Sequence, residues 1–310
     1  MTGIRTLVFR IVVIACGAIG VCAPSPAWGN VISVVPPPPG SDDHVIQDAV
    51  DKAKRGDTVM VYPGDYAGAV ITTSEIQVVG IQLLGQRVTI TKRPQDRDSA
   101  FTLKNISDVQ VLGFTFASQA GKDGYRRGIH VFNGRRITIA YNDFRVPIGI
   151  DSHLDDVTQA DGGLFDSRFI LNTFQEGTPG AFHGFILAIN MSGNSSGNFV
   201  ALNRIAAVGV TFGAGVAFWG VEANAHNSII LNTFDLSSGG AGAMVAGVLF
   251  AGHCSGNEVA FNDFSGVSTD LGAATDFVGA VGVWFTTVED IKGANEFRNN
   301  RDLTFTHWPE

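Results

Sequence analysis

Apolar and polar residues recur along this chain in one short motif, about once every thirty residues. The motif is a β-branched or aromatic residue, two variable residues, Asn, one further residue and usually Phe. Its five clear copies are spaced by 30, 31, 29 and 30 residues, and they carry Asn142, Asn172, Asn203, Asn232 and Asn262. A fixed period of this size predicts a solenoid, because each repeat can bury its apolar face only against its neighbours.

A second motif, interleaved with the first, predicts that the repeats are built from strands. Residues 184–188, 215–219, 247–251 and 282–286 each begin with Gly and are rich in Val, Phe and Ile. Such runs are typical of strands, whereas helical repeats need apolar residues at i, i+3 and i+4 over a dozen positions. We therefore predict an all-β fold, a right-handed parallel β-helix with coils about 4.8 Å apart.

The recurring Asn and Phe have structural explanations in such a fold. Asn tolerates the left-handed backbone of a tight bend, and stacked Asn side chains can hydrogen-bond from coil to coil. A turn needs Asn in every coil, whereas a binding site needs it once, so we expect a structural ladder. The Phe two residues later is expected to form a stack inside the solenoid.

The first part of the chain indicates export and a capped solenoid. Residues 1–29 have the pattern of a secretory signal peptide, with Arg5 and Arg10 before an apolar run and a small-residue cleavage site ending near Ala27. We predict a Pro-rich spacer at 30–41 and one β-helix domain at 42–310. Its first element, at about 43–55, is expected to be an amphipathic helix that caps the first coil.

Composition and charge narrow the class of partner. The chain has 310 residues, 45% of them hydrophobic, and a formal net charge of −8, which becomes more negative when the signal peptide is removed. An acidic surface argues against nucleic acid and anionic membranes as partners. No stretch after the signal peptide is long and apolar enough to insert into a membrane. We expect a secreted or periplasmic protein.

One face of the predicted solenoid gathers residues suited to chemistry on an anionic ligand. Side chains alternate along a strand, so the positions two and four residues after the first residue of each run should face outward. This places Lys104, His130, Asp151 and His153 on successive coils, next to Arg126, Arg127 and Phe132. Cations could neutralise a sugar carboxylate and acidify the adjacent C–H, while His or Lys takes the proton. The alternative is that these are ordinary solvated strand residues.

The same register makes the later coils of this face apolar. It turns Ile186, Ala188, Ala217, Trp219 and Trp284 outward. Trp219 could stack against a sugar ring. An apolar strip of this kind is covered either by long loops of the same chain or by self-association with a second chain, and the sequence leaves both open.

The loop that follows Asp151 is rich in carboxylates. Asp155, Asp156 and Asp161 lie within seven residues of one another, and closely spaced carboxylates could hold Ca²⁺. The alternative is a solvated acidic loop.

Three short segments near the start resemble a known superfamily. They are Ile46-Gln-Asp-Ala-Val50, Gly56-Asp-Thr-Val59 and Pro63-Gly-Asp-Tyr66. Together they look like the first coil of pectin-lyase-like proteins, which include polysaccharide lyases, alginate epimerases and NosD-like periplasmic proteins. The resemblance implies a parallel β-helix that cleaves, isomerises or binds acidic polysaccharides; fold alone fixes no activity.

A narrower resemblance falls on the predicted site. The stretch from Ile137 to His153 is similar to the stretch of mannuronan C5-epimerases that ends in their Gly-Phe-Asp-Pro-His motif. The resemblance implies that Asp151 and His153 match the catalytic Asp and His of that family. This sequence departs from the pattern in having Ile148 for Tyr, Ser152 for Pro, and Ala188 where a second Asp is expected on the next coil.

We therefore expect an exported β-helix protein that binds an acidic, uronate-containing polysaccharide and modifies it by proton abstraction at C5, as a lyase or epimerase. The alternative is a non-catalytic binding or assembly protein of the cell envelope. The sequence leaves open whether the protein is an enzyme.

Overall fold

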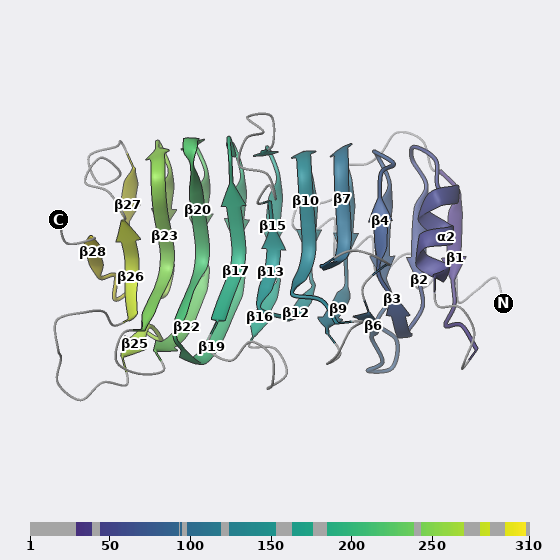
Figure 1. The fold of residues 1–310 in the computed structure, drawn as a ribbon, viewed down its shortest axis with the longest axis horizontal. Helices are drawn as coiled ribbons and strands as arrows, with labels where there is room; N and C mark the ends of the chain where they lie inside the picture. The colour runs from purple at the N-terminus through teal and green to yellow at the C-terminus, as the bar shows by residue number, and fades with distance from the viewer. Residues whose placement is uncertain are drawn as a thin grey trace.

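The chain folds as a parallel β-helix, as the repeat period predicts. The computed structural model describes residues 29–38, 44–92, 94, 98–118, 124–152, 163–175, 185–238, 243–269, 280–285 and 295–307. Figure 1 shows the strands side by side along the long axis, with the N-terminal coils at one end and the C-terminal coils at the other. Neighbouring strands of successive coils pair in parallel, and they form three long sheets.

Most coils of the solenoid contribute one strand to each of the three sheets, in the order A, B, C along the chain. Sheet A contains β1 (Val31–Val34), β2 (Thr58–Val61), β5 (Gln77–Gly80), β8 (Gln110–Leu112), β11 (Thr138–Ala140), β15 (Arg168–Ile170), β18 (Phe199–Ala201), β21 (Ser228–Ile230), β24 (Glu258–Ala260) and β27 (Glu296–Arg298). Sheet B contains β3 (Gly64–Ala67), β6 (Val88–Lys92), β9 (Phe114–Ala117), β12 (Asp143–Arg145), β16 (Thr173–Gln175), β19 (Arg204–Val210), β22 (Thr233–Ser238) and β25 (Ser268–Thr269). Sheet C contains β4 (Ala69–Ile71), β7 (Ser99–Ser107), β10 (Arg127–Arg135), β13 (Ile148–Asp151), β14 (Leu164–Phe165), β17 (Phe185–Ser192), β20 (Phe212–Ala225), β23 (Met244–Ser255), β26 (Ala280–Phe285) and β28 (Phe305–His307).

The predicted capping helix is present as α2 (Val45–Lys52), at the N-terminal end of the solenoid in Figure 1. Its apolar face, with Ile46, Ala49 and Val50, is buried in the same core as the first strands. Residue 43, where we expected the helix to begin, lies outside the described residues. Within the described residues, no helix is long and apolar enough to cross a membrane.

The strand β1 corrects the predicted boundary of the spacer. Residues 31–34 were assigned to the spacer at 30–41, yet they pair in register with β2 and so form the first strand of sheet A. Their β-branched residues fit a pleated surface, and Val34 is buried in the core. Within the described residues, β1 is therefore the first strand of the β-helix.

A buried carboxylate, Asp57, ties this first strand to the turn after the helix. Its oxygens accept hydrogen bonds from the backbone N–H groups of Lys54 at 2.8 Å and Asn30 at 2.7 Å. The bond from Lys54 is the main cause of a lowered pKa for this carboxyl group. A lowered pKa stabilises the fold above the carboxyl's unfolded pKa of about 3.9, and this stabilisation is lost as pH falls through the folded pKa.

We expect Asp57→Asn to lower the free energy of unfolding at pH 7 by about 1–3 kcal/mol, because an amide NH₂ cannot accept one of the two bonds. The difference between variant and wild type should shrink below about pH 4, because the unfolded chain then takes up a proton at Asp57 while the lowered pKa keeps the folded carboxyl ionised. Denaturant titrations between pH 7 and pH 3 measure both effects. A difference that stays constant over this range would contradict the role of Asp57.

The predicted Asn ladder is confirmed. In each coil the Asn side-chain oxygen accepts hydrogen bonds from the Asn of the preceding coil; Asn203 Oδ1, for example, accepts from the backbone N of Asn172 at 2.9 Å and from its Nδ2 at 3.1 Å. A second ladder, which the sequence analysis missed, lies at the turn before sheet A. It consists of Asn198, Asn227, Asn257 and Asn295.

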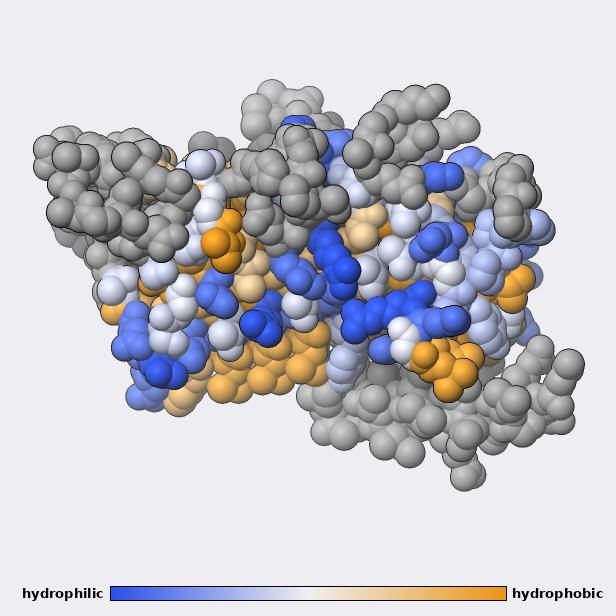
Figure 2. Space-filling model, turned by 90° about the horizontal axis from the view of Figure 1, so that it is seen from below, coloured by the Kyte–Doolittle hydropathy of each residue, from blue (hydrophilic) through white to orange (hydrophobic). Residues whose placement is uncertain are grey.

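The left-handed backbone, however, does not fall on the ladder Asn as predicted. It falls on the residue before it, where Tyr141, Leu171, Leu202, Leu231 and Phe261 have φ between 56° and 60°. The Asn itself is held by ladder bonds through both its side chain and its backbone N–H, so the preceding residue makes the bend. Most of these bend residues are exposed, and Figure 2 shows a band of apolar surface along one edge of the C-terminal half.

The predicted Phe stack fills the interior behind sheet B. Phe144 and Phe174 are parallel within 5°, with ring centroids 4.8 Å apart, and Phe234 stacks on Phe264 in the same way. Glycine faces these rings from sheet C: a Cβ on Gly128 would lie 2.6 Å from Phe144. The glycine that opens several of the strand motifs therefore makes room for the Phe stack.

The predicted register is confirmed for Val216, Phe218, Val248 and Phe250, which face the core, but it is wrong for β17. Ile186 and Ala188 belong to the main core, whereas Leu187 lies in the separate apolar cluster on the outer face. The cause is the pairing, because Leu187 lies opposite Ile148 and Asn190 lies opposite Asp151. Ala188, not Gly184, thus occupies the small-residue position of this coil.

Candidate functional site

The candidate site lies on the outer face of sheet C, where the strands of the early coils carry polar side chains. Thr102, His130, Asp151 and Asn190 come from β7, β10, β13 and β17 and are partners in register on successive strands. Parallel stacking therefore lines up four polar residues that are far apart in the sequence. All four are nonetheless buried.

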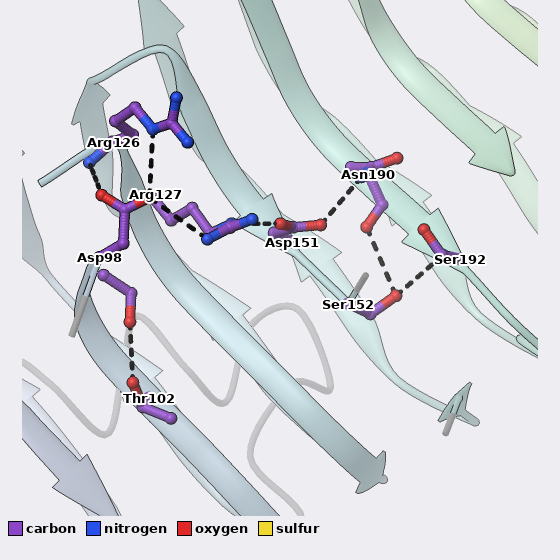
Figure 3. Close-up of polar contacts among 9 residues, drawn as sticks. Asp98, Thr102, Arg126, Arg127, Asp151, Ser152, Asn190 and Ser192 are labelled. Carbon is purple, nitrogen blue, oxygen red and sulfur yellow. Dashed lines mark hydrogen bonds and ion pairs between the residues drawn. The ribbon is translucent and has the colours of Figure 1, made fainter. Parts of the chain in front are cut away.

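Asp151 is at the centre of a polar network (Figure 3). Its Oδ2 accepts from Arg127 Nε at 2.6 Å, and its Oδ1 accepts from Asn190 Nδ2 at 2.9 Å. The Asp151 side chain is 1% exposed and that of Arg127 is 16% exposed. Removing two charges from water is costly unless their hydrogen bonds are satisfied, and here Arg127 and Asn190 together satisfy both carboxylate oxygens.

Asp98 extends the network to the protein surface. Its Oδ2 accepts from Arg127 Nη1 at 3.3 Å and from Arg126 Nε at 3.1 Å. Arg126 is half exposed. The network therefore has a buried end at Asp151 and a solvent-accessible end at Arg126, and Figure 3 shows Arg127 and Asp98 linking the two.

Asn190 also carries a polar atom that the protein leaves unpaired. An ionised carboxylate only accepts hydrogen bonds, so Asn190 must turn its NH₂ group toward Asp151. Its Oδ1 then points away, as Figure 3 shows, and it is buried with no hydrogen-bond partner in the described part of the chain. Ser152 holds the strand nearby, since its Oγ accepts from the backbone N of Ser192 at 3.1 Å. A buried acceptor without a donor is unfavourable, and a ligand hydroxyl would satisfy it.

The described members of the predicted line, Lys104, His130 and Asp151, lie in two rows, not one. His130 lies opposite Asp151, whereas Lys104 lies opposite Phe132, two residues farther along the strands. Phe132 packs on His130 with ring centroids 3.9 Å apart. Lys104 is exposed. An exposed cation and a largely buried imidazole therefore lie on the same face of neighbouring strands.

Several predicted site residues lie outside the described residues: His153, Asp155, Asp156 and Asp161. The calcium hypothesis thus remains a prediction. Within the described residues, no group of three His, Cys, Asp or Glu side chains is arranged to hold a metal ion.

The predicted apolar strip exists, but it is buried within the single chain. Leu187, Ala217, Leu249 and Trp284 form a compact cluster on the outer face of sheet C, with Trp219 partly buried against it. In the single chain this strip is therefore not an exposed patch, and self-association through it remains a prediction. Trp219 Nε1 is buried with no hydrogen-bond partner in the described residues, and Trp219 lies opposite Ser192 at the edge of the polar network.

Sequence reasoning missed Asp98 and Asn190. Asp98 directly precedes β7, in a polar stretch with no periodic signal. Asn190 follows Ala188 in the alternating segment Ile189-Asn-Met-Ser192. Counting the outward positions of this strand from Ala188 instead of Gly184 would have placed Asn190 on the outer face.

Comparisons with solved structures give weak similarities to other proteins. Alginate lyase from Paenibacillus sp. str. FPU-7 is 13% identical with a TM-score of 0.48, covering 90% of this chain and 98% of that one. A DFA-IIIase from Arthrobacter chlorophenolicus A6 in complex with GF2 is 16% identical with a TM-score of 0.47, covering 90% and 92%. Polygalacturonase from Erwinia carotovora ssp. carotovora is 9% identical with a TM-score of 0.43, covering 92% and 99%.

No protein-family model matches the sequence, and no curated protein matches it. Similarities this weak give no residue-by-residue correspondence. Function must therefore be inferred from the chain's own residues.

Proposed function

We propose that the chain is an exported β-helix protein, with residues 1–29 as its signal peptide, that binds a uronate-containing polysaccharide on the outer face of sheet C and abstracts the proton at C5. The observation that carries the proposal is the buried Arg127–Asp151 pair beside His130, on a sheet face where the default is solvated side chains. Buried charges in such a place are costly, which favours a functional role.

The balance of charge at the site supports an anionic substrate. Lys104, Arg126 and Arg127 outnumber the carboxylates of Asp98 and Asp151, although the whole chain has a formal charge of −8. Lys104 and Arg126 are the accessible cations. We assign these two to the uronate carboxylate, since charge-assisted hydrogen bonds there would stabilise the carbanion that forms at C5.

His130 is the proposed proton acceptor. Its imidazole nitrogen would take the C5 proton, and the electron pair of that bond would form a C4–C5 double bond as the C4–O bond breaks. The imidazolium would then protonate the leaving oxygen. Protonation of the carbanion from the opposite side of the ring would instead give the C5 epimer. Asp151 and Arg127 are positioning residues in this scheme. Asn190 Oδ1 would accept a hydrogen bond from a sugar hydroxyl.

An elimination yields an unsaturated uronate that absorbs in the ultraviolet, which gives a direct assay on alginate, pectate and glycosaminoglycans. We expect His130→Ala to lower kcat about 10²–10⁴-fold, the range for loss of a general base. Lys104→Met should mainly raise KM, because it removes a contact to the substrate carboxylate. Arg168→Met, which removes an exposed strand cation on sheet A, is the matched control and should be neutral.

Activity that survives in His130→Ala would refute its role. A second candidate function, non-catalytic binding in the cell envelope, is favoured by the fact that Asp151 has a partner on each carboxylate oxygen. Binding of a uronate polymer without any product, lost in Lys104→Met, would support that second function instead.

A further inference from the structure

A second cluster of charged residues lies on the outer face of sheet B, away from sheet C. Asp143 and Arg145 flank the inward-facing Phe144 in β12, so both point outward. Figure 2 looks onto the strands of sheet B and shows strongly hydrophilic side chains gathered across the middle of this face. No step of the proposed chemistry uses them.

The carboxylate of Asp143 organises this cluster. Its Oδ2 accepts from Arg145 Nη2 at 2.7 Å, Arg145 Nε at 3.0 Å and Arg87 Nη1 at 3.2 Å. Its Oδ1 accepts from Gln175 Nε2 at 2.7 Å. Asp143 is thus largely buried beneath three donor groups, which come from β12, from β16 and from the residue before β6.

The two guanidinium groups keep donors that Asp143 does not use. Each arginine has five N–H groups in a fixed fork. Arg145 Nη1, Arg87 Nε and Arg87 Nη2 have no partner recorded among the described residues, and both side chains are 48% exposed. Because the Asp143 carboxylate holds both arginine side chains in place, these remaining donors are pre-organised at the surface. They would bind an anionic ligand with a smaller loss of conformational entropy than mobile side chains would.

The cluster also carries a net positive charge. Arg204 lies in the same row as Asp143, two coils farther along, with Thr173 between them. At about 4.8 Å per coil, the row from Asp143 to Arg204 spans about 10 Å. Arg87, Arg145 and Arg204 still outnumber the carboxylates of Asp143 and of Asp235, which lies one coil beyond Arg204. This excess on an acidic chain indicates a binding surface for anions rather than a simple surface ion pair.

We propose that Arg87 and Arg145, with Arg204 beside them, form a second binding site for the oxyanion groups of an acidic polysaccharide. Guanidinium forks match the planar carboxylate of a uronate and also bind sulfate, so either group is a suitable ligand. Half-exposed arginines on a flat sheet face suit a long polymer lying along the solenoid. The site shares only its class of ligand with the proposed function.

Isothermal titration with short oligomers tests the site, using a uronate tetrasaccharide, a sulfated tetrasaccharide and a neutral tetrasaccharide as separate probes. Arg87→Met and Arg145→Met are each expected to weaken uronate binding about tenfold, the effect of one charge-assisted hydrogen bond. The double variant should lose one bound oligomer per chain. Arg145→Lys keeps the charge but loses the guanidinium fork, so its affinity for the uronate probe should fall between that of the wild type and that of Arg145→Met.

Arg301→Met is the matched control, since Arg301 is an exposed arginine that pairs with Asp263 and Asp302 at the far end of the same sheet face. It should titrate as wild type. Which acidic probe binds more tightly identifies the oxyanion. Equal binding of the neutral probe, a double variant that titrates as wild type, or no binding of any probe would overturn the proposal. Lys104→Met should still bind the oligomer at Arg87 and Arg145. Failure of this second site can therefore be told apart from failure of the proposed chemistry at His130.

Discussion

Asn203→Ala is expected to lower the free energy of unfolding by about 3–6 kcal/mol, because it leaves several buried groups unpaired in the middle of the solenoid. Asn203 Oδ1 accepts from the backbone N and the Nδ2 of Asn172, and its own Nδ2 donates to the carbonyl of Phe169 at 2.8 Å. Alanine keeps none of these bonds. The cost is large because the groups left behind stay buried between coils that still stack.

Chemical denaturation of the variant and the wild type measures this cost. Asn194→Ala is the matched control, because Asn194 is exposed and should change stability by no more than about 0.5 kcal/mol. Comparable stability of the two variants would mean that the ladder does not stabilise the fold. The account of the repeat motif would then be wrong.

Arg127→Met is expected to destabilise the protein by about 3–5 kcal/mol, the cost of leaving a buried charge without its partner. Asp151 would lose its ion pair with Arg127, while its side chain remains 1% exposed. Arg126→Met is the matched control. Arg126 bonds to the same Asp98 but is half exposed, so its loss should cost less than about 1 kcal/mol.

The double variant Arg127→Met, Asp151→Leu removes both buried charges and should be more stable than Arg127→Met alone. Thermal or urea unfolding of the two single variants and the double variant completes the cycle. If stability is regained while all activity is lost, the ion pair serves function rather than folding. If the stability lost in the double variant equals the sum of the losses in the two single variants, the two charges do not interact.

The fold was largely predictable because its causes repeat. The Asn period, the Phe two residues later and the Gly-led apolar runs each recur in several coils, so misreading one copy of a motif does not change the predicted fold. The Phe144–Phe174 stack and the Asn142–Asn172 bond were therefore expected, and both are present. The helix near Val45 was predictable from its apolar face alone.

The features that were missed depend on single residues. The left-handed bend at Leu202 follows from how Asn203 is bonded, which a propensity for Asn does not show. The register of β17 depends on Ala188 replacing a glycine, and one such substitution moved the expected partner of Asp151 from Ala188 to Asn190. Ion pairs such as Arg127 with Asp151 depend on side-chain reach across coils, and the sequence pattern fixes only which face each side chain takes.

Proton exchange at C5 tests the central claim most directly. Wild-type protein is incubated with uronate oligomers in D₂O, and the sugars are examined by mass spectrometry and NMR. Proton abstraction predicts deuterium at C5 or a C4–C5 double bond, and neither with His130→Ala. Oligomers from alginate, pectate and glycosaminoglycans that all remain intact and free of deuterium at C5 would contradict the claim.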